Sequence, residues 1–206
     1  MTKTKAPANN QYHHGDLYQS LLTAAVDMIS EGGVATLSMR KLADKVGVSR
    51  TAPYHHFKDK NELLCAIAEQ GFTHQETTAG RLRQQVAGQS LRQQFEVYVS
   101  SYISFAHENS EQYDLMFGRE IWKNGSPTAN LKTVSRQSFQ RWLEWIELLQ
   151  QQGIMPDQDS ALRVAQVSWA TLHGLCRLLN DGIYTDTSNL SEMTQSAVNM
   201  LLKSDQ

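Results

Sequence analysis

The chain is poor in residues that break helices, and it contains no long apolar run. Only 4 of its 206 residues are proline and 12 are glycine. It lacks the alternation of apolar and polar residues, with turn dipeptides between the runs, that is typical of an all-β fold. No stretch of about 18 apolar residues occurs, so no membrane-spanning helix is expected. These absences leave a helical protein with enough apolar residues, 40%, to form a core.

Cysteine is also scarce, since Cys65 and Cys176 are the only two. Both lie in apolar helical surroundings, and we expect two buried reduced thiols rather than a disulfide or a redox switch. The first residues, MTKTKAPANNQYHHGD, lack the apolar segment of a secretory signal. We therefore expect a cytoplasmic protein.

Enzyme signatures are missing as well. There is no nucleophile elbow, dinucleotide-binding glycine motif, phosphate-binding loop or zinc-protease motif. The adjacent pairs His13-His14 and His55-His56 point in different directions on a helix, and no His/Cys cluster has the spacing of zinc ligands. We expect no catalytic residues, no metal and no cofactor.

Charge is distributed unevenly along the chain. Residues 1–60 hold eight Lys/Arg and five Asp/Glu, a net charge of +3, whereas the remaining 146 hold eleven and sixteen, a net charge of -5. A basic end and an acidic body suit a protein that presents one face to phosphates.

Apolar residues at helical spacing predict an all-α fold of about nine helices. Asp16, Ser38, Ser49 and Asp59 are expected to cap the first four helices, and Gly47 is expected to form the turn between the second and third. The predicted helices cover approximately residues 17–31, 39–46, 50–56, 60–83, 90–108, 111–118, 128–152, 159–179 and 188–203.

The segment Ser38–Lys60, SMRKLADKVGVSRTAPYHHFKDK, has the pattern of a helix-turn-helix. Its second short helix is expected to project from a three-helix unit, and an α-helix fits the major groove of DNA. Arg50 has the geometry to donate to a guanine edge or a phosphate, while Thr51 and Ala52 are small enough to allow close approach. Lys60 lies in the first turn of the next helix, where free backbone N–H groups also favour an anion.

Residues 14–70 resemble the TetR family of bacterial transcriptional regulators, most specifically in the run Tyr54-His55-His56-Phe57-Lys58-Asp59-Lys60. Pro53 departs from the commoner aliphatic residue. Proline at this position occurs in a subgroup of the family, which this chain also resembles at residues 12–17 and at Trp169-x-x-x-His173-Gly174. The resemblance assigns phosphate contacts to Tyr54, His56 and Lys60. The DNA-binding residues that we expect are Ser38, Met39, Arg40, Ser49, Arg50, Thr51, Ala52, Tyr54, His55, His56 and Lys60.

The resemblance implies three regions. They are a flexible arm at residues 1–13, where Lys3 and Lys5 have the reach to contact phosphate, a DNA-binding domain at 14–74 with the helix-turn-helix at about 37–56, and a regulatory and dimerisation domain at 75–206. It also implies a homodimer formed by the last two helices, whose apolar residues are too many for one core. The predicted dimer interface contains Leu162, Trp169, Leu172, Leu175, Leu179, Met193, Ala197, Met200 and Leu201.

The middle helices are rich in aromatic residues, which either form an ordinary core or surround a cavity for a small apolar or aromatic ligand. The residues that we expect around such a ligand are Tyr98, Tyr102, Phe105, Tyr113, Phe117, Trp142, Trp169 and His173.

These patterns predict a DNA-binding transcriptional regulator, most simply a homodimeric repressor on a palindromic operator that a small ligand releases. The alternative is a regulator or activator that binds DNA without any ligand.

Overall fold

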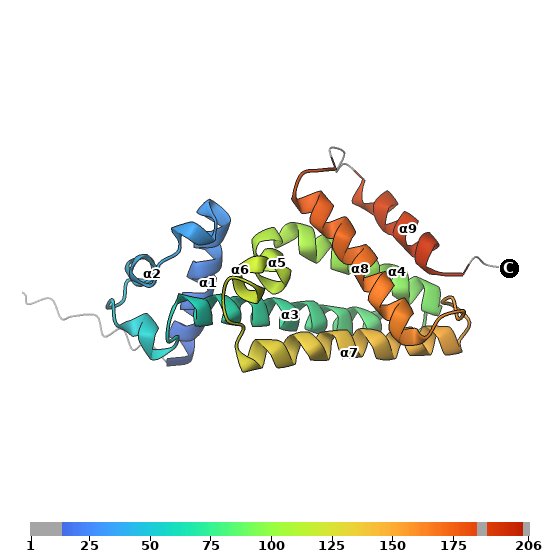
Figure 1. The fold of residues 1–206 in the computed structure, drawn as a ribbon, viewed down its shortest axis with the longest axis horizontal. Coiled ribbons are helices and arrows are strands. Elements are labelled where there is room, and N and C mark those ends of the chain that lie inside the picture. Colours follow the sequence, from blue (N-terminus) through green and yellow to red (C-terminus); the bar gives the residue numbers. More distant parts are fainter. Residues whose placement is uncertain (1–13, 185–188, 204–206) are drawn as a thin grey trace, which may run out of the picture. The chain divides into compact units, whose positions relative to one another are not determined.

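The computed structural model describes residues 14–184 and 189–203, and within these ranges every regular element is helical (Figure 1). The predicted all-α fold is confirmed. The predicted arm at residues 1–13, with Lys3 and Lys5, lies outside the described residues. Among the described residues, no helix has the length and apolar character needed to cross a membrane. The helices are α1 (His14–Gly32), α2 (Met39–Val46), α3 (Lys60–Gln85), α4 (Leu91–Glu108), α5 (Ser110–Phe117), α6 (Arg119–Trp122), α7 (Ala129–Gln151), α8 (Ala161–Asn180) and α9 (Leu190–Leu201), with 3₁₀ turns η1 (Val34–Thr36) and η2 (Ala52–His55).

The chain divides into two compact units, Met1–Leu63 and Leu64–Gln206. In the first, α1 packs against η1 and α2, and α2 packs against η2. Its core contains Leu21, Ala25, Leu42 and Phe57, all nearly inaccessible to solvent. The expected domain ranges of 14–74 and 75–206 place the boundary further along α3.

Several helix ends follow from the local sequence. The Ser38 hydroxyl accepts a hydrogen bond from the Lys41 N–H at 3.2 Å, as expected of a cap. Gly47 ends α2 with φ of 77°, a left-handed conformation that costs a residue with a Cβ about 1–2 kcal/mol. Asp59 accepts from the Glu62 N–H at 2.9 Å at the start of α3. Ser90 forms a capping box with Gln93 before α4.

The second unit is a helical body in which α8 packs against α4 and α7, and α9 packs against α4. Its interior is aromatic, as the sequence indicated, and buries Phe95, Tyr102, Tyr113, Trp142 and Trp145. The residues of α3 that belong to this unit run beside α7, and Arg141 of α7 forms an ion pair with Glu76 of α3 (Figure 1).

Some predicted helix boundaries are wrong. The helix α1 begins at His14, so Asp16 lies within it rather than before its first residue. The helix predicted at residues 159–179 is α8, which begins at Ala161, after Ser160. The short helix α6 was not predicted.

The third predicted helix, residues 50–56, is the 3₁₀ turn η2. Proline has no N–H, so Pro53 cannot bond the Ser49 carbonyl four residues back, and that carbonyl accepts from the Ala52 N–H at 2.9 Å instead. The bonds from Tyr54 to Thr51 and from His56 to Pro53, both 3.1 Å, continue the tighter pattern.

Candidate nucleic-acid interface and effector cavity

The segment Ser38–Lys60 presents a polar, basic surface in the first unit. It contains six Lys/Arg and two Asp/Glu, a net charge of +4. Six of the predicted DNA-binding residues are exposed, and four more are partly exposed. The exposed ones are Arg40, Ser49, Arg50, Thr51, Tyr54 and His55, and the partly exposed ones are Ser38, Ala52, His56 and Lys60.

The side chains around η2 are only loosely held. The Arg50 Nε lies 3.8 Å from the Asp44 carboxylate, and both side chains are more than half exposed. An exposed pair at this distance contributes little to stability, so the guanidinium can exchange this partner for another. Tyr54 is 55% exposed, although tyrosine usually buries most of its ring. Arg50 and Tyr54 are thus accessible to a partner molecule.

Met39 is among the predicted DNA-binding residues, and its side chain is 5% exposed and belongs to the core. The helical period explains this burial, because Met39 shares the inner face of α2 with Leu42 and Ala43. Its backbone N–H remains at the amino end of α2, where the first N–H groups of a helix have no carbonyl partner within the helix.

Two predicted phosphate-binding residues also support the fold of this unit. The Lys60 ammonium donates to the Val34 carbonyl at 2.6 Å, which leaves two of its three donors for another acceptor. The His56 ring lies 6.0 Å from the Tyr18 ring, and Tyr18 stacks on Phe57 at 5.1 Å. Sequence reasoning missed Tyr18, because nothing in the spacing of α1 distinguishes it from other partly apolar residues.

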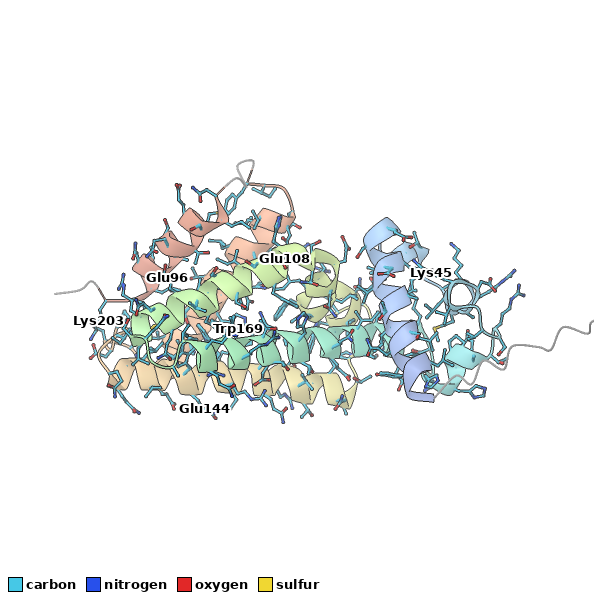
Figure 2. All side chains as sticks on the ribbon, turned by 180° about the vertical axis from the view of Figure 1, so that it is seen from behind. Lys45, Glu96, Glu108, Glu144, Trp169 and Lys203 are labelled. Atoms are coloured by element: carbon cyan, nitrogen blue, oxygen red, sulfur yellow. The ribbon has the colours of Figure 1, made fainter. Side chains whose placement is uncertain are left out.

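The second unit contains a small cavity, of about 50 Å³, bounded by α3, α4, α7 and α8. Four of the predicted ligand residues line it: Tyr98, Tyr102, Trp142 and Trp169. Trp169 lies among the helices of this unit, whereas Glu144 points outward from α7 (Figure 2). Sequence reasoning missed the polar part of the lining, namely Gln75, Glu76, Arg83, Ser138 and Arg141.

The other four predicted ligand residues do not line this cavity. Phe105 is buried against His74, with ring centroids 5.4 Å apart. Phe117 lines a second pocket, of about 220 Å³, to which Trp169 also contributes. Tyr113 and His173 belong to a chain of hydrogen bonds beside the cavity.

These hydrogen bonds link four side chains, and one direction of donation is consistent along all of them. The Trp169 indole N–H donates to the Tyr102 hydroxyl at 3.1 Å. The hydroxyls of Tyr102 and Tyr113 are 2.9 Å apart, and the Tyr113 hydroxyl lies 2.7 Å from the His173 Nδ1. Every member is satisfied when Tyr102 donates to Tyr113 and Tyr113 donates to an unprotonated Nδ1.

The electrostatics of His173 agree with an unprotonated Nδ1. Burial, and secondarily the nearby Arg177 guanidinium, lower the pKa of His173, while Asp114 acts in the opposite direction. Burial likewise raises the pKa of both Tyr102 and Tyr113 above the ordinary tyrosine value. All three side chains are therefore neutral near pH 7, which suits a chain of neutral donors and acceptors.

The residues predicted at the dimer interface are not all available for contact. Leu172, Leu179 and Ala197 are buried in the interior of the chain itself, which removes them from the outer surface. Helical spacing could not tell the inner apolar face of α8 from the outer one. Leu162 and Met200 are exposed, and the others are partly exposed: Trp169, Leu175, Met193 and Leu201.

Cys65 and Cys176 are both buried, as expected. Across residues 14–184 and 189–203, no group of three or more His, Cys, Asp or Glu side chains is placed to hold a metal ion.

A helix-turn-helix unit followed by a helical body with an aromatic interior defines a class of DNA-binding regulators. Profile comparison agrees with this class. Residues 21–67 match the bacterial regulatory proteins of the tetR family, and residues 97–201 match the tetracyclin repressor-like C-terminal domain. The second match alone spans half of the chain, and the protein belongs to the TetR family of transcriptional regulators.

Curated relatives are similar over limited regions. The class A tetracycline repressor of Escherichia coli transposon 1721 is 46% identical over 50 residues, which are 24% of this chain and 23% of the repressor. The transcriptional activator FasR of Mycolicibacterium smegmatis is 27% identical over 116 residues, 56% of this chain and 52% of FasR. The chain thus spans between a quarter and a half of these relatives. They are regulators rather than enzymes, as the sequence predicted.

Solved structures match over nearly the whole chain. A protein of unknown function from Rhodococcus sp. RHA1 is 28% identical with a TM-score of 0.77, covering 95% of this chain and all of the other. The fatty acid degradation regulator FadR of Bacillus halodurans has a TM-score of 0.72 at 15% identity, covering 93% of this chain and 97% of FadR, and it supports the fold alone.

Proposed function

We propose that this regulator is a homodimeric repressor that binds a palindromic operator through Ser38–Lys60 and leaves it when a small ligand occupies the body. The observation that carries the DNA assignment is the accessible, basic surface around η2, on which Arg50 and Tyr54 are both exposed. In this proposal Arg50, Thr51 and His55 read bases, while Ser38, Tyr54, His56 and Lys60 hold the phosphate backbone.

Exposed apolar residues on the last two helices support the dimer. Val167 of α8 is 64% exposed, and Met200 of α9 is 80% exposed. Leu162 and Leu178 are two further exposed apolar residues of α8. Large apolar side chains gathered on neighbouring elements are typical of a surface that another protein covers. In a homodimer two reading segments face one duplex, and half-sites about 34–36 Å apart make a palindromic site the natural target.

Ligand release requires a difference in ligand affinity between the DNA-bound and free forms. Emptying an operator takes roughly 3–5 kcal/mol of such a difference per dimer. The helix α3 contributes residues to both units and lines the cavity at Gln75, Glu76 and Arg83. It is the natural element through which occupation of the cavity influences the first unit.

A second candidate is a regulator that activates transcription or needs no ligand. The activator role named for FasR, which matches more than half of this chain, favours it. A transcription assay with the isolated operator separates the two candidates, because a repressor lowers the transcript level and an activator raises it.

The DNA assignment is tested by fluorescence anisotropy on an operator duplex and on single-base variants of it. Arg50→Ala is expected to relax discrimination at one base position by about 1–3 kcal/mol. Tyr54→Phe is expected to weaken binding to all duplexes alike through loss of one phosphate hydrogen bond, with the salt slope unchanged because tyrosine supplies no cation for counterion release. Lys123→Ala, an exposed lysine of the second unit, is the matched control and should bind like the wild type. Full discrimination by Arg50→Ala would overturn its assignment.

A further inference from the structure

The cavity in the second unit has a pre-formed aromatic wall. Tyr98 and Trp142 stack at 5.3 Å, and Trp145 meets Tyr98 edge-on at 4.9 Å. The Trp142 indole N–H is anchored by the Ala165 carbonyl at 3.0 Å and the Ser168 hydroxyl at 3.2 Å. These rings are fixed by packing and hydrogen bonds within the protein, so a ligand meets flat apolar faces whose orientation is already set.

One buried polar group in the lining has no partner. Gln75 is only 9% exposed, and its side-chain amide nitrogen makes no hydrogen bond. A buried donor without an acceptor is destabilising, and native proteins rarely leave one unless a ligand or water uses it. The rest of the wall beside it is largely aromatic. Gln75 therefore favours a ligand that carries a hydrogen-bond acceptor.

The charges in the lining favour an anion. Two guanidinium groups, Arg83 and Arg141, face one carboxylate, Glu76, which gives a net charge of 2 - 1 = +1. Glu76 is already paired with Arg141. Within the described residues no carboxylate forms an ion pair with Arg83, whose guanidinium lies over the Trp145 ring, 5.7 Å from its centroid. A cationic ligand would compete with Arg83 for that aromatic face, whereas an anionic ligand would gain a partner in Arg83.

We propose that the effector of this cavity is a small aromatic carboxylate, whose ring packs against Tyr98, Trp142 and Trp145 and whose carboxylate accepts from Gln75 and a guanidinium. This inference rests on the proposed function, because it names the chemical class of the ligand. The cavity of about 50 Å³ is too small for such a molecule as it stands. Binding therefore requires Arg83 to leave the face of Trp145, where the ligand ring then packs.

The test is isothermal titration calorimetry on the full-length chain with ligand pairs of matched shape. Benzoate and 2-naphthoate are compared with benzamide and 2-naphthamide, and benzyltrimethylammonium serves as the cationic probe. At least one carboxylate is expected to bind tenfold or more tightly than its amide, since a hydrogen bond to a charged acceptor contributes roughly 1.5–3 kcal/mol. Equal or tighter binding of the amide or the cation, or no binding of any probe, would overturn the inference.

Two variants locate the site. Gln75→Leu and Arg83→Gln are each expected to weaken carboxylate binding by roughly tenfold or more, through loss of a donor to the carboxylate. Arg81→Gln, an exposed arginine on the same helix as Arg83 that does not line the cavity, should leave binding unchanged. Unchanged affinity in both cavity variants, with their circular dichroism intact, would contradict this placement. If either variant fails to fold, the comparison of matched ligands on the wild type still tests the proposed ligand class.

Operator release is measured separately by anisotropy. Carboxylate binding without release supports the ligand class and contradicts the release step of the proposed function. Release by the amide or the cation, with no carboxylate bound, overturns the ligand class and leaves the proposed function standing.

Discussion

The phenylalanine substitution at Tyr113 removes one hydroxyl from the buried chain that joins Trp169, Tyr102, Tyr113 and His173. That hydroxyl takes part in two hydrogen bonds, of 2.9 Å to Tyr102 and 2.7 Å to His173 Nδ1. Each bond contributes about 1 kcal/mol net, and its loss costs up to about 2 kcal/mol where a buried donor or acceptor is left unpaired. We therefore expect Tyr113→Phe to lower the free energy of unfolding by about 2–4 kcal/mol.

The assay is urea unfolding followed by circular dichroism at a fixed protein concentration, since any dimer makes stability depend on concentration. With a slope of about 2–3 kcal/mol per molar urea, the midpoint should fall by roughly 1 M at unchanged slope. Tyr54→Phe, which alters an exposed tyrosine, is the control and should move the midpoint very little. The double variant Tyr102→Phe/Tyr113→Phe should lose less than the sum of the two single losses, because both share one bond. A loss below about 0.5 kcal/mol in Tyr113→Phe would refute the directed chain of hydrogen bonds.

Three further predictions concern other parts of the molecule. Gly47→Ala should cost about 1–2 kcal/mol in thermal or urea unfolding, because φ is 77° there, and a neutral result would contradict that conformation. The lowered pKa of His173 means that below pH 6.5 the unfolded chain gains a proton that the native histidine resists, so stability falls as pH decreases. His173→Asn, which keeps an acceptor for Tyr113, should make the stability profile between pH 7.5 and 5.5 shallower, and an unchanged slope would exclude this role. Val167→Glu should dissociate the proposed dimer in light scattering, whereas Leu148→Glu, exposed on α7, should not.

Local signals in the sequence predicted much of the fold. The caps at Ser38 and Asp59 and the turn at Gly47 are decided by residues within one helical turn, and all three are confirmed. The 3₁₀ turn η2 was missed because its form depends on one absent N–H, that of Pro53.

The sites were harder to predict because they depend on tertiary packing. Aromatic spacing identified Tyr98 and Trp142 beside the cavity, but the same spacing also selected Phe105, which is plain core. Gln75 and Arg83 were not predicted as ligand residues, since polar residues on a helix usually face solvent. Leu172 and Val167 lie on one helix and are both apolar, yet only the fold tells which is buried.

The central claim, that two copies of Ser38–Lys60 read one duplex, is tested most directly by selecting bound sequences from a random double-stranded DNA library with the full-length protein. The account predicts enrichment of an inverted repeat whose half-site centres are about 10 base pairs apart. Arg50→Ala should lose preference at symmetric positions in both halves. Enrichment of a single asymmetric site, or of no sequence, would contradict the account.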